Sequence, residues 1–114
     1  IVLNPIYFEF DKANITNQAA FELDKLISIM KKYPKIIIRA ESHTDSRGPA
    51  SYNKLLSDRR AKSTAQYVIS KGIDENRISG FGMGEEDPEI DCSLGCSKDE
   101  HAKNRRSEFI IVSR

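Results

Sequence analysis

The chain has 114 residues, and its 18 Lys and Arg nearly balance 17 Asp and Glu, for a formal net charge of +1. That length suits one domain with its own hydrophobic core, and the balanced charge argues against a nucleic-acid or anionic-membrane surface. No apolar run approaches the roughly 20 residues needed to cross a bilayer. The chain opens without Met and within a strand-like pattern, so we expect it to be part of a longer protein.

The first half of the chain is predicted to form a strand, a helix and a second strand. Residues 6–10 ("IYFEF") alternate and are rich in aromatic side chains, as strands are. Thr16 can cap a helix over residues 17–32, and Pro34 ends it. Residues 35–42 form the second strand, whose three consecutive isoleucines indicate a central position with burial on both faces. The apolar stripe of the helix consists of Ala19, Leu23, Leu26, Ile27 and Met30.

The second half of the chain is predicted to add a long helix and two more strands. Pro49 suits the first position of the helix, which runs to about Lys71, with Gly72 just past its end. Its buried side consists of Leu56, Ala61, Thr64, Ala65 and Val68. The remaining elements are a short strand within 76–84, a short helix near 97–104 and a strand over 107–114. The order β-α-β-α-β-(α)-β predicts an α+β two-layer sandwich, with helices on one face of a mixed four-stranded sheet.

The two cysteines lie close together in "DCSLGC", as Cys92 and Cys96. An even count at short spacing favours a disulfide in an oxidising compartment. Free thiols are one alternative. A metal site is another, since Asp91 and His101 are near, but the spacing fits no standard zinc pattern.

Catalytic signatures are weak in this sequence. No serine or cysteine lies in a recognisable nucleophile setting, and there is no P-loop or dinucleotide fingerprint. His43 and Asp45, two residues apart, share one face of an extended chain. Hydrolysis through this pair would still need a nucleophile or a metal. We therefore expect neither an enzyme nor a cofactor.

A binding site is indicated where the second strand leads into the long helix. Asn53 and Arg60 are seven residues apart, so two helical turns bring them to nearly the same face. The turn with Thr44 and Asp45 leads into the N-terminal end of that helix. A ligand there would meet an anion at Asp45, a fork of donors at Arg60 and an amide at Asn53. These groups suit a zwitterion, whose ammonium would pair with Asp45 and whose carboxylate would take two bonds from Arg60.

Charge patterning alone leaves a simpler interpretation open. Asp45 and Arg60 could pair with each other or lie in solvent. The residues of "NRR" near the end of the chain, Asn104, Arg105 and Arg106, could likewise cap or clamp the last strand without touching a ligand.

Five segments in the same order resemble the OmpA C-terminal-like domain, which is also found in peptidoglycan-associated lipoproteins and flagellar stator proteins. They are "YFEFDKANI", "SHTDSRGPASYN", "LSDRRAKSTAQYVISKGI", "RISGFGMGEEDP" and "NRRSEFII". Together they cover nearly the whole chain. Each segment alone is weak, but their combination is specific.

The resemblance implies non-covalent binding of peptidoglycan through the diaminopimelate of the stem peptide, whose free amino and carboxyl groups form a zwitterion. Matched motif by motif, the implied ligand-binding residues are Asp45, Arg60, Thr44 and Asn53, with Phe10 and Asp11 of the first loop as weaker candidates. The "CSLGC" segment is an insertion that ordinary members lack. It suggests a stapled loop near the pocket or near a partner surface.

The resemblance also implies a place in the cell envelope. We expect residues 1–114 to be a single domain, the C-terminal part of a larger protein on the periplasmic side of the outer membrane. Any contact with the membrane would come through other parts of that protein. The alternative function is a periplasmic protein–protein interaction module with the same fold.

Overall fold

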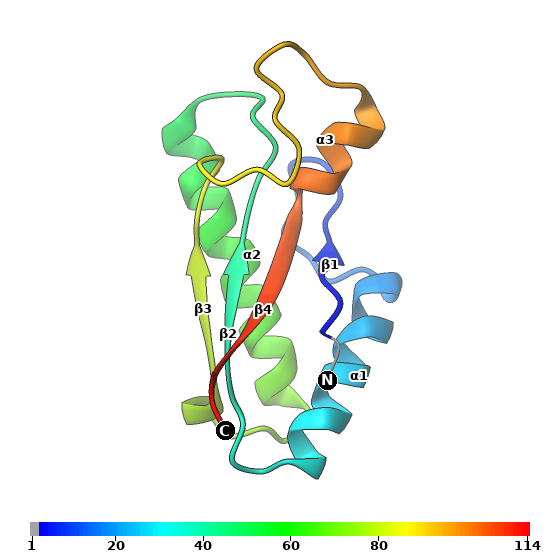
Figure 1. Ribbon diagram of the computed structural model, residues 1–114, viewed down its shortest axis with the longest axis vertical. Coiled ribbons are helices and arrows are strands. Elements are labelled where there is room, and N and C mark those ends of the chain that lie inside the picture. Colours follow the sequence, from blue (N-terminus) through cyan, green and yellow to red (C-terminus); the bar gives the residue numbers. More distant parts are fainter. Residues whose placement is uncertain (1–2) are drawn as a thin grey trace.

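The computed structural model describes residues 3–114 as four strands and three α-helices (Figure 1). In chain order the elements are β1 (Ile6–Tyr7), α1 (Asn17–Lys32), β2 (Ile37–Ser42), α2 (Ala50–Ser70), β3 (Ile78–Gly82), α3 (Lys98–Asn104) and β4 (Arg106–Ser113), with a 3₁₀ turn, η1, at Glu75–Arg77. No helix among the described residues is long and apolar enough to span a membrane.

The four strands form one mixed sheet in the order β1-β4-β2-β3. β4 is antiparallel to both β1 and β2, whereas β2 and β3 are parallel. The C-terminal strand is therefore central, and it joins the first strand to the rest of the sheet (Figure 1). The predicted α+β class with a mixed four-stranded sheet is confirmed.

α1 and α2 share one hydrophobic core with a single face of the sheet. Thr16 caps α1 as predicted, its hydroxyl accepting a bond from the backbone N–H of Ala19 at 3.1 Å. All five residues of the predicted α1 stripe are buried. On α2, Leu56, Ala61, Thr64 and Val68 are buried as predicted, whereas Ala65 is only half-buried. The core cluster contains Ile6, Phe8, Ala19, Leu23, Leu26, Ile27, Met30, Ile36, Ile38, Val68, Ile73 and Ile78.

β2 is central, but the prediction that it is buried on both faces is wrong. Ile38 and Ala40 are fully buried, whereas Ile37, Arg39 and Glu41 between and beside them are half-buried. No helix within residues 3–114 covers this outer face, so charged side chains are tolerated there. Arg39 pairs with Glu41 at 2.7 Å.

Several predicted boundaries differ from the structure by one to three residues; β2, for example, begins at Ile37 rather than at residue 35, and β4 spans Arg106–Ser113 rather than 107–114. β1 ends at Tyr7 rather than at residue 10, because β4, its pairing partner, begins only at Arg106. Pro49 is the cap of α2, and the helix begins one residue later and ends at Ser70. The start of the chain, expected to lie within a strand, falls partly outside the described residues.

β3 packs very closely on α2. A Cβ atom at Gly80 would lie 2.6 Å from the carbonyl oxygen of Ala61, and one at Gly82 would lie 2.6 Å from the hydroxyl of Ser57. Just beyond β3, the N–H of Gly84 donates to the Ser57 hydroxyl at 2.8 Å, and its carbonyl accepts from the N–H of Thr44 at 2.9 Å. These contacts fix the turn that follows β2 against the first half of α2.

Candidate functional site

The six residues predicted to bind a ligand all line one cavity of about 270 Å³. It lies beyond the C-terminal end of β2, between the loop that follows β1 and the first half of α2. Its lining consists of the predicted Phe10, Asp11, Thr44, Asp45, Asn53 and Arg60, together with Arg47, Gly48, Pro49, Tyr52 and Leu56. Their roles toward a ligand remain predictions.

The Asp45 carboxylate is buried and already paired. Its Oδ1 accepts from the backbone N–H of Arg47 at 3.1 Å and from Nε of Arg47 at 3.3 Å. Its Oδ2 accepts from Nη2 of Arg47 at 2.9 Å and lies 3.5 Å from Nη1 of Arg105. Burial by itself raises the pKa of Asp45, but the hydrogen bonds from Arg47 and the charges of Arg47 and Arg105 outweigh burial and lower it. Asp45 is therefore a carboxylate at neutral pH.

The Arg60 guanidinium forms the floor of the cavity and is 0% exposed. Its Nε, Nη1 and Nη2 donate to the backbone carbonyls of Lys12, His43 and Glu9, at 2.8, 3.0 and 3.1 Å. Two of its five N–H groups are left over. Within residues 3–114 it forms no ion pair with a carboxylate. Burial, aided by the charge of Arg105, lowers the pKa of Arg60 to about 10, so it stays charged.

The sequence left open that Asp45 and Arg60 pair with each other or lie in solvent, and the structure shows neither arrangement. They do not pair with each other, and neither lies in solvent. The anion is neutralised by Arg47 and Arg105. The buried cation is held by carbonyl dipoles that offer only partial negative charge, so it is electrostatically open to an anion.

The side chain of Asn53 holds the turn that contains Asp45 in place through hydrogen bonds. Its Nδ2 lies 3.0 Å from the carbonyl of Arg47, 3.3 Å from that of Asp45 and 2.9 Å from Oε1 of Glu85. The predicted amide contact to a ligand would have to compete with these acceptors. In this state Asn53 positions the turn.

The loop after β1 closes the other side of the cavity. The Arg47 guanidinium stacks on the Phe10 ring, 4.4 Å from its centre. The hydroxyl of Tyr52 donates to the carboxylate of Asp11. Asp11 has a positive φ of 59°, a conformation that aspartate tolerates better than most side chains. The two contacts join the loop to α2 and to the turn across the cavity mouth.

His43 and Thr44 are both buried, and Thr44 also lines the cavity. Neither ring nitrogen of His43 nor the hydroxyl of Thr44 has a hydrogen-bond partner within residues 3–114. Burial, followed by the nearby charge of Arg106, lowers the pKa of His43. His43 makes no hydrogen bond to Asp45, and the pair therefore lacks the geometry of a general base and its orienting carboxylate.

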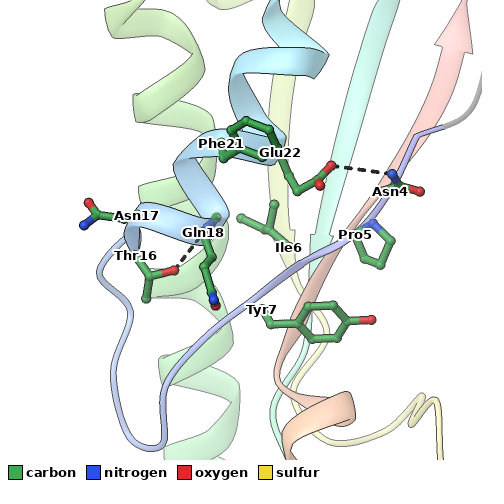
Figure 2. A pocket seen from close by; sticks show the side chains of 10 residues that line it. Asn4, Pro5, Ile6, Tyr7, Thr16, Asn17, Gln18, Phe21 and Glu22 are labelled. Atoms are coloured by element: carbon green, nitrogen blue, oxygen red, sulfur yellow. Dashed lines mark hydrogen bonds between the residues drawn. The ribbon is translucent and has the colours of Figure 1, made fainter.

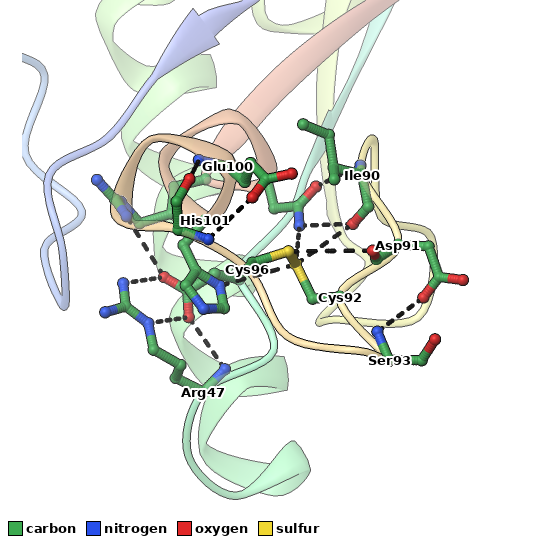
Figure 3. The surroundings of a disulfide bond; sticks show 12 residues. Arg47, Ile90, Asp91, Cys92, Ser93, Cys96, Glu100 and His101 are labelled. Carbon is green, nitrogen blue, oxygen red and sulfur yellow. Dashed lines mark hydrogen bonds and ion pairs between the residues drawn. A yellow bond between two sulfur atoms is a disulfide. The ribbon is translucent and has the colours of Figure 1, made fainter.

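Cys92 and Cys96 form a disulfide, as favoured from the sequence (Figure 3). Cys92, Cys96 and His101 bring ligand atoms within 4.8 Å of one another. A metal would need thiolates, and both sulfurs are used by the disulfide. The predicted candidate Asp91 instead accepts a bond from the backbone N–H of Ser93 at 2.9 Å. The stapled loop lines a second cavity that also includes Thr44, so it lies near the candidate site.

A larger cavity lies elsewhere, between β1 and α1 (Figure 2). It has a volume of about 670 Å³ and is mostly apolar, with Ile6, Tyr7 and Phe21 among its lining residues. Glu22, which accepts a bond from Asn4 at 3.5 Å, is the charged residue in its wall. None of the predicted site residues reaches it.

Sequence reasoning missed Arg47 and Tyr52 and underestimated Arg105. The sequence left open that Arg105 holds the last strand in place. Arg105, just before β4, does join that strand to the loop after β1, because its Nε donates to the carbonyl of Phe8 at 2.8 Å. It also faces Asp45. The backbone contact of Arg47 could have been suspected, because an aspartate in a turn commonly accepts from the N–H two residues on.

Comparisons with known proteins agree with this architecture. The OmpA family matches residues 7–105. The peptidoglycan-associated lipoprotein of Haemophilus influenzae is 35% identical over 104 residues, which are 91% of this chain and 66% of that protein. Outer membrane porin F of Pseudomonas aeruginosa is 33% identical over 90% of this chain, but the match spans only 29% of the porin.

Solved structures show the same fold. The peptidoglycan-associated lipoprotein of Burkholderia pseudomallei superposes with a TM-score of 0.85 at 26% identity, over 93% of this chain and 87% of that one. The C-terminal domain of Helicobacter pylori MotB superposes with a TM-score of 0.84 at 22% identity, over 99% and 87% of the two chains. Because the family model matches residues 7–105, most of this chain, the chain belongs to the OmpA family.

Proposed function

We propose that this domain binds peptidoglycan non-covalently, by holding the zwitterionic end of diaminopimelate in the stem peptide. The curated relatives include lipoproteins named for their association with peptidoglycan. The OmpA family is a family of non-enzymatic domains. Peptidoglycan is accordingly a ligand of this chain and not a substrate.

The observation that carries the proposal is the state of Arg60. A fully buried guanidinium lines a cavity, keeps two N–H donors unused and pairs with no carboxylate in the described part of the chain. Burying a charge is costly unless an opposite charge and hydrogen bonds compensate. A ligand carboxylate at this position would supply both. Because Arg60 has no exposed surface, the ligand reaches it by displacing part of the cavity wall.

The second charge of the ligand is matched by Asp45. The ammonium of diaminopimelate would pair with this carboxylate, while Thr44, Asn53, Phe10 and Asp11 would complete the contacts. A cavity of about 270 Å³ suits the end of one amino-acid side chain better than a whole saccharide. The site would therefore recognise the peptide of the wall rather than its sugars.

The same reasoning suggests what the domain does for a larger protein. Because the chain spans 66% of the Haemophilus lipoprotein and less of the porins, we propose that residues 1–114 are one domain of a larger protein. We further propose, from the resemblance to OmpA C-terminal-like domains, that it is the C-terminal part. It would anchor an outer-membrane or periplasmic protein to the wall from the periplasmic side. Other parts of that protein would contact the membrane.

A two-peptide binding experiment tests the proposal. Lysine lacks the terminal carboxylate of diaminopimelate, so a lysine stem peptide leaves Arg60 without its partner. A charge-assisted hydrogen bond contributes about 1.5–3 kcal/mol, so calorimetry should find the lysine peptide roughly ten- to a hundredfold weaker. Asp45→Asn should weaken both peptides, because both carry the ammonium. Equal affinities would remove the assignment to Arg60.

Retention on purified sacculi separates this function from a protein–protein interaction module. Wall binding predicts that the domain co-sediments with sacculi and that free diaminopimelate peptide releases it. An interaction module would stay in the supernatant at low salt. Release of soluble muropeptides during the incubation would indicate a hydrolase instead and would overturn the proposal.

A further inference from the structure

We propose that Arg47 is a latch: its guanidinium occupies the position of the ligand's ammonium at Asp45, and it must swing out before a ligand can bind. This inference rests on the proposed function, because it concerns the same cavity. It assigns to Arg47 the control of affinity for any ligand that brings a cation to Asp45.

The first argument is the saturation of Asp45. A carboxylate has about four acceptor positions. Asp45 has four donors around it: the backbone N–H, Nε and Nη2 of Arg47, and Nη1 of Arg105. An arriving ammonium with three donors finds none of these positions free. One of the two arginines has to leave.

The second argument identifies which arginine leaves. The side chain of Arg105 is 14% exposed, and its Nε is tied to the carbonyl of Phe8 at 2.8 Å. The side chain of Arg47 is 39% exposed, and among residues 3–114 the polar and cation–π contacts of its guanidinium are with Asp45 and the ring of Phe10. Arg47 can therefore turn into solvent without stranding a buried donor. Its backbone N–H can stay on Asp45 and preserve the turn.

The third argument is the contact with Phe10. Arg47 belongs to the turn before α2, whereas Phe10 belongs to the loop after β1, on the other side of the cavity. Their stacking at 4.4 Å therefore bridges the cavity mouth. Phe10 is 57% exposed, so little else holds it in place. Release of Arg47 would uncover Asp45 and free Phe10 in one movement, opening the way to Arg60 below.

Arg47→Gln tests the latch, because glutamine keeps the backbone N–H and much of the side-chain length but removes the charge. The Arg47 side chain is 39% exposed, so solvent screens much of its pairing with the buried Asp45. The variant should therefore bind the diaminopimelate peptide about 1.5- to fivefold more tightly than the unmutated chain. The lysine peptide should gain by the same factor, because it brings the same ammonium. Arg59→Gln, an exposed arginine outside the cavity, is the matched control and should change neither affinity.

The possible outcomes separate the latch from the proposed function. If Arg47→Gln weakens the diaminopimelate peptide more than the lysine peptide, Arg47 grips the ligand carboxylate and the latch is wrong. Unchanged affinities would also overturn it. If neither the unmutated chain nor the variant binds either peptide, the proposed function fails and the latch fails with it.

A measurement without ligand tests the pairing itself. Burial raises the pKa of Asp45, and the hydrogen bonds from Arg47 lower it. Loss of the Arg47 guanidinium should therefore raise the pKa of Asp45, as followed by the carboxyl ¹³C signal during an NMR titration. A pKa that does not change would mean that Arg47 does not cover Asp45 in solution, which would overturn the latch.

Discussion

At the scale of single residues, the candidate site uses side chains that also hold the fold together. Arg60 is the main example, since its three bonds reach the loop after β1 and the end of β2, which are far apart in the sequence. Asn53 has a similar double role at the turn. Substitutions at either position therefore report on stability as well as on binding.

We expect Arg60→Ala to destabilise the domain strongly. The change removes the donor that serves the buried carbonyl of His43 and the part-buried carbonyls of Lys12 and Glu9, of which Glu9 still accepts from the N–H of Lys12. A buried group left unsatisfied costs about 1–3 kcal/mol, and truncating a fully buried side chain adds the cost of a cavity. Urea denaturation should show a loss of about 3 kcal/mol or more. Arg59→Ala, on the exposed side of the same helix, should stay within about 0.5 kcal/mol of the original stability. Equal effects of the two substitutions would contradict the structural role of Arg60.

We expect His43 to make the domain less stable in mild acid. Its pKa is lowered in the folded state by burial and by Arg106, against the opposing charges of Glu108, Asp87 and Glu41. Histidine in the unfolded chain has a pKa of about 6.5. Between that pH and the lower pKa of the folded state, His43 is protonated in the unfolded chain and neutral in the folded one. The stabilisation from neutral His43 is complete above about pH 6.5 and is lost as the pH falls toward the folded pKa, by up to about 1.4 kcal/mol per pH unit.

Urea denaturation of His43→Phe between pH 7.5 and pH 5 tests this expectation. Phenylalanine keeps an aromatic ring without a titrating group, so the loss of stability below about pH 6.5 should shrink. The same change at His101, the only other histidine in the chain, should leave the loss in place. An unchanged pH dependence in His43→Phe would show that another group is responsible.

At the scale of elements, the site depends on how closely β3 approaches α2. Gly80 allows the strand to lie against the backbone of Ala61. We expect Gly80→Ala to cost about 1–3 kcal/mol, because the new methyl group forces the strand away from the helix. Ser79→Ala, the neighbouring exposed position, should cost much less. Chemical denaturation of both variants checks the difference, and equal stabilities would mean that the sheet and helix adjust freely.

At the scale of the whole molecule, the disulfide is an addition to a fold that has its own core. No residue of the segment 84–104 belongs to the hydrophobic core cluster. The chain-entropy estimate for so short a loop is about 2 kcal/mol or less. The double change Cys92→Ser and Cys96→Ser should therefore unfold cooperatively and keep its binding to sacculi. Loss of the cooperative transition would show that the loop supports the fold after all.

Local signals explain why much of the fold was predictable from the sequence. The stripe of α1 and its cap at Thr16 depend on 3.6-residue periodicity and on neighbouring backbone donors, which are properties of adjacent residues. The order of elements then restricts the layers to a few arrangements. A further local signal went unused: Ser97 and Glu100 form a capping box at the start of α3. The half-buried outer face of β2 was not predicted, because a run of isoleucines does not reveal whether a second layer of structure covers that face.

By itself the sequence determined the elements, their mixed sheet and a set of polar residues that belong together, because these follow from periodicity, turn chemistry and motif spacing. Only the tertiary structure decided which group each of these charged side chains pairs with. The partners of Asp45 are Arg47 and Arg105, and those of Arg60 are backbone carbonyls. Hydrogen bonding and burial of a side chain depend on which distant segments of the chain pack together. The order of residue types along the chain does not by itself specify those contacts.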